Sequence, residues 1–364
     1  MLQFKPDYEQ SRARIEAFWE RKVLDRPVTM FYLAKPRNQQ CPVPPSHHAN
    51  PAARWLDTQY QAELALANLA NQEFLGDTLP IAYPNLGPAI FAGLYGCPLH
   101  FDDNGTSWSE PILKDWSQVD QLRLDWGHAY LRKLIEMTEA LLSIGQNRFI
   151  TGMPVWRPGG DALAAFRGLG KLTADLVDHP QEVKTLLDRV EKDYFQVYDM
   201  FFQKLRSRGQ PITSWTPLVS ESKYYIPCSD FSATLSKETF DEFFLPGIIR
   251  ECRYFERTIY HLESPGALPH LDSILSISKL DAIKWAPGAE MEGFTRWVKI
   301  YQRAQAAGKG VQVNVRMDEV PQVMQTLSPR GLFLNVSGVP DHDTGLAMLR
   351  ALERWTAEMR KVHR

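Results

Sequence analysis

The chain of 364 residues is 44% hydrophobic and 23% charged, and its formal net charge is −2. That balance is typical of a globular protein with a sizeable core, and it excludes a strongly basic surface of the kind that attracts nucleic acid or an anionic membrane. Its cysteines form no CxxC pair, its N-terminal segment is charged and unlike a signal peptide, and no apolar run approaches the ~20 residues of a bilayer span. We therefore expect a cytoplasmic protein with a small-molecule substrate.

The N-terminal half alternates between helical and strand-like patterns. Helices are predicted at residues 7–22, 53–72 and 128–144, and strands at residues 27–34, 79–83 and 149–155. A loop over residues 36–51 is dense in proline, and residues 98–120 are predicted to hold only short β pieces and polar turns. The sequence leaves open whether the proline-rich loop is a lid or an ordered insertion.

The alternation is more regular in the C-terminal half. Helices are predicted at residues 161–175, 180–205, 236–255 and 344–362, and strands at residues 211–216, 258–261, 282–285, 310–315 and 331–336. About eight strands, each followed by a helix and without a low-complexity linker, favour one α/β domain over residues 1–364. We expect a single, distorted (β/α)8 TIM barrel with an N-terminal helix and loop insertions. An open doubly wound sheet is the alternative. The glycine motifs that bind phosphate in such sheets are absent: no GxGxxG follows the first predicted strand, and no GxxxxGK(S/T) occurs in the sequence.

The most informative pair of residues is His261 and Glu263, at the end of a predicted strand and before a Pro-Gly turn. Side chains two residues apart on a strand point to the same face, so both can converge on one ligand, metal ion or proton. The carboxyl ends of barrel strands are where such folds keep their chemistry. We predict that the pair is catalytic, either as metal ligands or as an acid–base pair; the alternative is a structural histidine beneath a turn.

Cys228 and Asp230 lie in a loop near another predicted strand end. A catalytic zinc ion needs a third protein ligand, and Cys228 is the cysteine best placed to join His261 and Glu263 in that role. Asp230 is predicted to be catalytic and to orient the substrate, with a turn or capping role as the alternative. Asp161 opens a helix and is expected mainly as its cap.

Aromatic and amide side chains at other strand ends are predicted to line the substrate pocket. A pocket of this kind combines apolar walls with a few polar groups that fix the ligand. The predicted substrate-binding residues are Tyr83, Asn85, Trp156, Trp215, Trp285, Asn314 and Asn335.

Four segments together resemble the uroporphyrinogen decarboxylase superfamily. They are FLGDTLPIAYPNLGPAIFAGLYG at 74–96, DALAAFRGLGKLTADLVDHPQEV at 161–183, CSDFSATLSKETFDEFFLPGIIRECRYF at 228–255 and IYHLESPGALPHLDSILSISKLDAIKWAPGAE at 259–290. The resemblance covers roughly residues 25–360 and implies a distorted (β/α)8 barrel with a deep cleft at the carboxyl ends of the strands.

Within the superfamily, the resemblance is nearer to the corrinoid-linked methyltransferases than to the true decarboxylases. The latter carry an arginine-rich signature after the first strand, where this chain offers only Lys35 and Arg37. The thiol-directed methyltransferases hold zinc with a His-x-Cys pair and a late cysteine, whereas this chain has His261-x-Glu263 and no cysteine after Cys252. The resemblance therefore implies that a zinc site here would have mixed nitrogen and oxygen ligands.

The implied activity is transfer of a methyl group between a small substrate and a corrinoid carried by a separate protein. Two alternatives stay open: a decarboxylase or other lyase on a small carboxylic acid held by Lys35 or Arg37, and a ligand-binding barrel without catalysis. The sequence does not fix the oligomeric state, and a homodimer is among the options.

Overall fold

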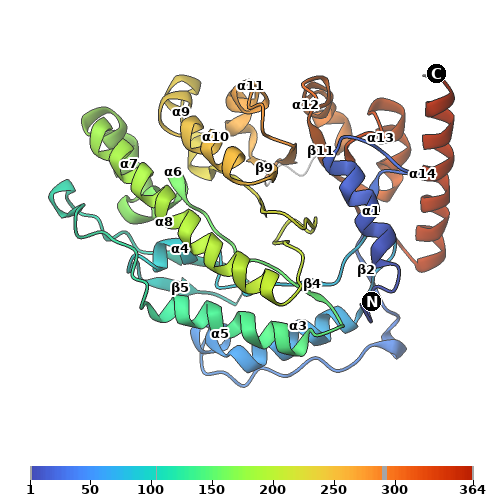
Figure 1. Cartoon of the computed structure of the whole chain (residues 1–364), viewed down its shortest axis with the longest axis horizontal. Coiled ribbons are helices and arrows are strands. Elements are labelled where there is room, and N and C mark those ends of the chain that lie inside the picture. The colour runs from blue at the N-terminus through green and yellow to red at the C-terminus, as the bar shows by residue number, and fades with distance from the viewer. Residues whose placement is uncertain (1, 104, 289–292, 363–364) are drawn as a thin grey trace.

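The computed structural model describes residues 2–103, 105–288 and 293–362 (Figure 1). The first part of the chain holds helices α1 (Tyr8–Trp19), α2 (Pro51–Leu56), α3 (Thr58–Ala70), α4 (Ile90–Gly93) and α5 (Ala129–Ile144), with η1 (Arg37–Gln39) and η2 (Trp116–Gln118) as 3-10 turns. Its strands are β1 (Val28–Phe31), β2 (Leu33–Ala34), β3 (Gln72–Glu73), β4 (Ile81–Ala82), β5 (Leu99–Phe101), β6 (Ser107–Ser109) and β7 (Ile150–Thr151).

The second part of the chain is richer in helices. These are α6 (Gly159–Arg167), α7 (Leu169–Asp178), α8 (Pro180–Ser207), α9 (Lys237–Phe243), α10 (Leu245–Tyr254), α11 (Leu271–Leu275), α12 (Phe294–Ala306), α13 (Val320–Thr326) and α14 (His342–Val362), with the 3-10 helices η3 (Asp230–Thr234), η4 (Pro265–His270) and η5 (Met317–Glu319). The strands are β8 (Tyr224–Tyr225), β9 (Arg257–Glu263), β10 (Ala282–Ala286), β11 (Gly310–Arg316) and β12 (Leu332–Ser337). No helix among the described residues is both long and apolar enough to cross a bilayer.

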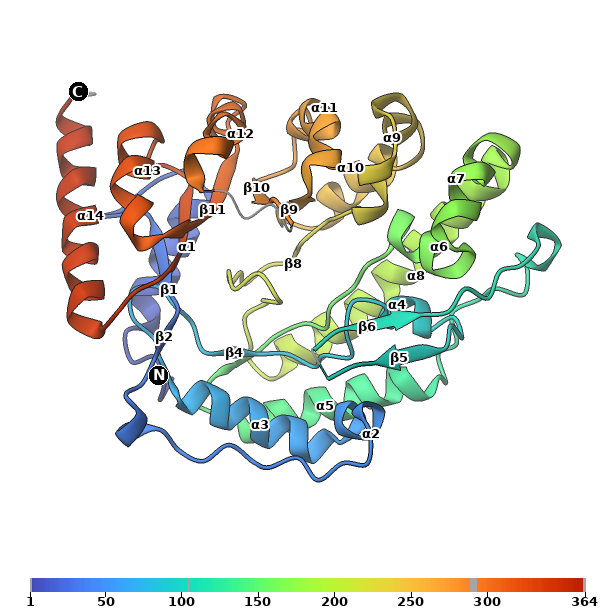
Figure 2. The same ribbon diagram turned by 180° about the vertical axis from the view of Figure 1, so that it is seen from behind.

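Six strands form one curled parallel sheet, in the order β1-β12-β11-β10-β9-β8. The helices that connect them lie in a row outside the strands, which Figure 2 shows from behind for α9 to α14. The register places His261 of β9 beside Lys284 of β10, and Asn314 of β11 beside Asn335 of β12. All carboxyl ends of these strands therefore meet at one edge of the sheet.

The α/β class is confirmed, but the described strands do not close into the expected ring of eight. β4 and β7 pair in a separate two-stranded sheet, and the predicted strand at 211–216 forms only an isolated bridge between Ile212 and Ser220. Prolines explain the short strands: Pro80 and Pro84 flank β4, and proline lacks the N–H that a strand ladder needs.

Two predicted helices are broken in the structure. The segment 161–175 divides between α6 and α7 at Gly168, whose φ of +85° favours glycine. The segment 236–255 divides into α9 and α10, with Pro246 in the first turn of α10.

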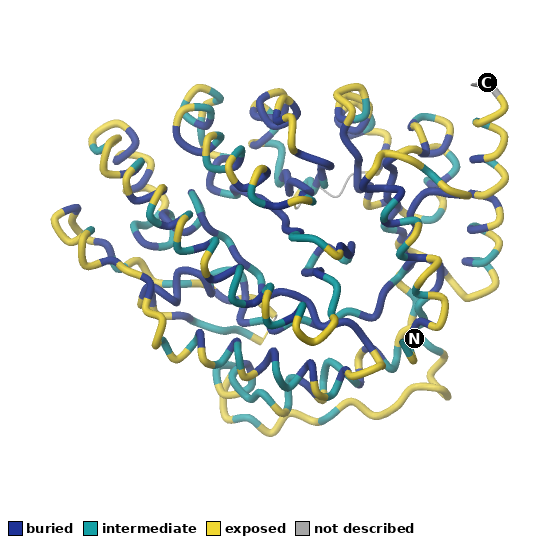
Figure 3. The backbone as a smooth tube through the Cα atoms, viewed as in Figure 1, coloured by how far each residue is buried: buried dark blue, intermediate teal, exposed yellow. Residues whose placement is uncertain are grey.

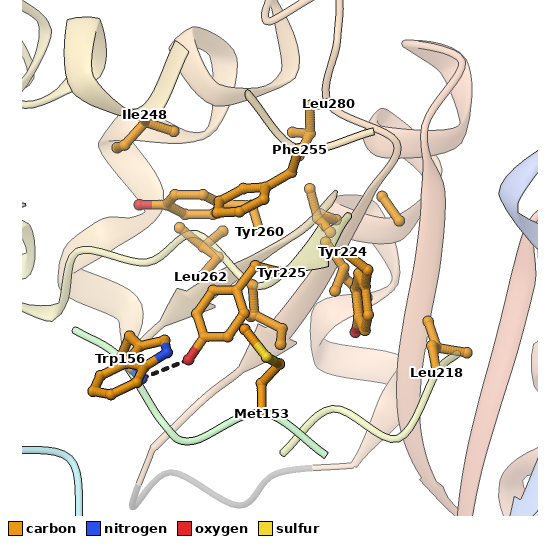
Figure 4. Packing of buried hydrophobic residues seen from close by; sticks show 14 of the residues in the cluster. Met153, Trp156, Leu218, Tyr224, Tyr225, Ile248, Phe255, Tyr260, Leu262 and Leu280 are labelled. Carbon is orange, nitrogen blue, oxygen red and sulfur yellow. Dashed lines mark hydrogen bonds between the residues drawn. The ribbon is translucent and has the colours of Figure 1, made fainter. Parts of the chain in front are cut away.

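One hydrophobic core extends from Ile15 on α1 to Leu352 on α14. Figure 3 shows burial along the strands and exposure on the outer turns of the helices, as expected for parallel strands covered on both faces. Part of this core is drawn in Figure 4, where the Tyr225 hydroxyl accepts a hydrogen bond from the backbone N–H of Trp156. The same hydroxyl donates to the Pro154 carbonyl over 2.9 Å, so Tyr225 fixes the segment that precedes Arg157.

Candidate functional site

His261 and Glu263 form a hydrogen-bonded pair at the carboxyl end of β9. His261 Nε2 lies 3.0 Å from Glu263 Oε2, and the imidazole is buried whereas the carboxylate is partly exposed. Burial lowers the pKa of His261, against the opposing effect of Glu263, and the hydrogen bond from His261 lowers the pKa of Glu263. A neutral imidazole whose Nε2–H faces a carboxylate keeps a free lone pair on Nδ1, and His261 Nδ1 is buried without a partner.

The backbone just after Glu263 holds the strand end against η3. Ser264 has φ +67° and ψ 151°, a region that residues other than glycine rarely adopt, and its N–H donates to the Ala286 carbonyl over 2.8 Å. A Cβ on Gly266 would lie 2.4 Å from the backbone oxygen of Ala233, so only glycine permits this close approach of η4 to η3. Because Asp230 begins η3, this contact places its carboxylate at the end of β9.

Asp230 meets His261 and Glu263 in one cluster. A ligand atom from each of the three lies within 4.8 Å of the others, and Asp161, Cys228 and Asp230 form a second cluster of this kind. The structure therefore brings together all four residues that the sequence predicts as catalytic residues or metal ligands, and joins Asp161 to them.

Arg157 supplies a positive charge to these carboxylates. Its guanidinium pairs with Asp230, and its Nη1 lies 3.8 Å from Asp161 Oδ2. Burial alone lowers the pKa of Arg157, but its acidic neighbours, among them Asp161 and Glu263, raise it overall, so the guanidinium stays charged. Burial raises the pKa of Asp161, although its hydrogen bond from the Phe231 N–H, 2.8 Å long, opposes that rise.

Lys284 of β10 lies on the other side of His261. Its Nζ is 4.4 Å from the centre of the Trp215 ring, and the edge of the same indole meets the His261 ring at 5.0 Å between centroids. Burial lowers the pKa of Lys284 to about 8, while Glu263 opposes this shift and Arg157 adds to it. Two cations, Arg157 and Lys284, and two carboxylates, Asp230 and Glu263, thus lie around His261.

A cavity of about 690 Å³ opens beside this centre. Its charged wall consists of Arg157, Asp161, Asp230 and Glu263, and its apolar wall includes Trp108. The volume suits a small organic molecule, since ligand pockets commonly measure 300–1,000 Å³.

Two features of the clusters disfavour a bound zinc ion. The guanidinium of Arg157 already neutralises Asp230, which belongs to both clusters of potential ligands. Cys228 is a poor ligand, because burial raises the pKa of its thiol to about 12 and the thiol donates to Asp161 over 3.8 Å. Zinc ligation by His261, Glu263 and Cys228 stays a prediction.

The predicted pocket residues lie in different places. Trp215 contacts His261, whereas Trp156 packs against Phe91 and Phe201 in the core, and Trp285 packs against Trp297 of α12.

The other four predicted pocket residues lie in two further places. Tyr83 and Asn85 line a separate cavity of about 150 Å³ next to α3 and α5. Asn335 Nδ2 donates to Asn314 Oδ1 over 3.0 Å and to the Tyr32 hydroxyl over 3.1 Å, which makes a polar ladder across β11, β12 and the end of β1. Substrate binding by these residues stays a prediction.

Sequence reasoning missed Arg157 and Lys284. Each is a single cation in an apolar run, VWRPGG at 155–160 and AIKWA at 282–286. A charge in such a run is buried at high cost unless it has a task or a partner, and that is the signal that could have singled them out.

Comparisons with known proteins support the fold. No protein-family profile matches the chain, and no protein with a curated description matches it. Among solved structures, the chain is similar to a methyltransferase from Methanosarcina mazei, with a TM-score of 0.59 over 94% of this chain and 98% of the other. The two sequences are 10% identical, so the likeness extends to the fold alone.

Proposed function

We propose that the protein is a methyltransferase-type enzyme that moves a methyl group between a small substrate and a separate corrinoid protein. The observation that carries the proposal is the buried His261–Glu263 pair at the strand ends, with Glu263 on the wall of the 690 Å³ cavity. The fold shared with a methyltransferase and the resemblance of the sequence support the same class.

The chemistry assigned to this chain is positioning and proton transfer. The His261–Glu263 pair accepts the proton of the substrate heteroatom: Glu263 lines the cavity, and the imidazole that is hydrogen-bonded to it keeps a free Nδ1 behind it. Asp230 and Arg157 orient the substrate in the cavity, whose apolar wall includes Trp108. The corrinoid, when bound, supplies a cobalt centre that exchanges methyl groups.

Conversion of methylcobalamin, followed by visible absorbance with small thiols, amines and phenols as acceptors, tests the proposal. We expect wild-type protein to demethylate the cofactor with at least one acceptor, and His261→Ala to lower the rate ~10²-fold or more, because a positioned base contributes that much. His342→Ala, which changes an exposed histidine outside the cavity, is the control. Lack of conversion with every acceptor contradicts the proposal.

A second candidate, a lyase that acts on a small carboxylic acid, is favoured by the cations of the site. Arg157 lines the cavity and Lys284 lies beside it, whereas Lys35 lines another cavity with Glu73 and His342. Carbon dioxide release from small keto acids tests this candidate, and release without methylcobalamin conversion selects it.

A further inference from the structure

Lys284 is half-buried and differs from the buried Lys5 and Lys309 in its contacts. Among the described residues it makes no hydrogen bond or salt bridge, and its one close polar contact is the face of Trp215. By contrast, Lys309 Nζ donates to the carbonyls of Ile277 and Leu280 over 2.6 and 2.9 Å. Lys5 Nζ likewise donates to the Gly76 carbonyl over 2.6 Å. The Lys284 amine therefore has no acceptor among the described residues and is free to contact a ligand.

The strand geometry turns the amine toward the candidate site. Lys284 is the register partner of His261 on the neighbouring parallel strand, so both side chains point to the same face of the sheet. The next residue, Trp285, points to the opposite face and packs against α12. Lys284 therefore joins Trp215, His261 and Glu263 on the inner face.

The surroundings of Lys284 make its ammonium less favourable than that of an exposed lysine. Burial lowers the pKa of Lys284 to about 8. Glu263 favours the ammonium and Arg157 disfavours it. A desolvated lysine near a second cation is one of the known ways in which a protein activates an amine nucleophile.

We propose that Lys284 is a nucleophile that forms an imine with a small carbonyl compound bearing a carboxylate. The neutral Nζ attacks the carbonyl carbon, and the electron pair of the C=O π bond moves to oxygen, which takes up a proton. The carbinolamine then loses its hydroxyl as water while the nitrogen lone pair forms the C=N bond. The two protons of the amine and the carbonyl oxygen leave as one water molecule, so no oxidant or reductant is needed.

The carboxylate of the substrate has a donor within the same centre. Arg157 Nε is buried without a hydrogen-bond partner, and a guanidinium N–H is suited to a carboxylate oxygen. The neighbouring His261 is placed to carry the proton to and from the carbonyl oxygen. This inference is independent of methyl transfer and gives the lyase candidate its covalent chemistry.

Reductive trapping tests the proposal. Full-length protein is incubated with pyruvate and sodium cyanoborohydride, and peptide mass mapping locates lysines that carry the carboxyethyl group. Lys279, an exposed lysine five positions earlier, is the matched reference within the same chain. We expect occupancy at Lys284 to exceed that at Lys279 by at least about tenfold, because only Lys284 is activated.

Variants separate an imine from adventitious labelling. Lys284→Arg keeps the positive charge but cannot form an imine, so the label at this site should vanish, whereas Lys279→Arg should leave it unchanged. Circular dichroism checks that both variants fold. If Lys284→Arg does not fold, the comparison of labelling at Lys284 and Lys279 in wild-type protein tests the proposal by itself. Labelling spread evenly over exposed lysines overturns the proposal, and so does trapping that survives in folded Lys284→Arg. Because trapping needs no turnover, its failure is distinguishable from failure of the carbon dioxide or methylcobalamin assays.

Discussion

Arg157 controls the charge balance around Asp161 and Asp230. Its guanidinium pairs with Asp230 and lies near Asp161, so it occupies the electrostatic position that a divalent cation would need. A metal ion and this arginine therefore compete for the same carboxylates.

Removing this arginine should open the cluster to metal. We expect Arg157→Gln to bind Zn²⁺ at least about tenfold more tightly than wild type, because one unit charge a few ångströms away is worth more than the 1.4 kcal/mol of a tenfold change. Competition with a chromophoric chelator measures the affinity. The control is Arg316→Gln, an exposed arginine paired with Asp318 outside the cluster. Equal affinity of wild type and Arg157→Gln for Zn²⁺ would show that the guanidinium does not compete with the metal ion.

At the scale of elements, the junction of η3 and η4 fixes the geometry of the site. The missing side chain of Gly266 lets η4 approach the backbone of Ala233, and this contact keeps Asp230 beside the end of β9. The junction thus contributes to the site without a functional group of its own.

We expect Gly266→Ala to destabilise the protein by ~1–3 kcal/mol, because its Cβ would press on a backbone oxygen that cannot move freely. Activity should fall as well, since η3 carries Asp230. Gly170→Ala is the matched control: this glycine lies in α7 with nothing within 4 Å of an added Cβ, and we expect neutral or slightly increased stability. Denaturant titration of both variants measures the change, and equal stability of the two would refute the packing argument.

The strands also show where sequence reasoning succeeds. The predicted strands at 258–261, 282–285, 310–315 and 331–336 correspond closely to β9, β10, β11 and β12. These segments contain no proline and are rich in branched aliphatic and aromatic residues, a pattern that favours buried parallel strands. The strands near prolines are shorter than predicted, because a missing N–H interrupts the ladder.

The candidate site was only partly predictable for a related reason. His261, Glu263 and Asp230 follow strand ends in sequence, and the fold brings them together. In a strand buried on both faces, however, apolar residues do not alternate with polar ones, so the pattern does not say which residues point inward. For this reason Trp285 was predicted to line the pocket, whereas the residue of β10 that lies beside His261 is Lys284.

On the scale of the whole molecule, one core joins the beginning and the end of the chain. The larger cluster of buried residues runs from α1 to α14, and a smaller one lies around α3 and α5. Trp19 of α1 adds a buried hydrogen bond of 3.0 Å to the Val219 carbonyl, 200 residues further on.

We expect the protein to unfold in one cooperative transition. Far-ultraviolet circular dichroism, which reports helices, and tryptophan fluorescence, which reports packing, should give coincident curves in denaturant. Two separated transitions would instead indicate that the six-stranded sheet and the N-terminal helices are distinct folding units.

The two faces of β10 carry different side chains, and this limits how the length of the strand can vary. In a pleated strand, a shift by one residue exchanges the two faces. A single residue inserted into or deleted from β10 ahead of Lys284, with the start of the strand held in register, would therefore turn the indole of Trp285 toward His261 and the amine of Lys284 toward Trp297. The connecting residues 276–281 include exposed positions at which substitutions should be tolerated. The loop can also absorb changes of length, whereas a change of length inside β10 must keep Lys284 on the inner face if the site is to keep its amine.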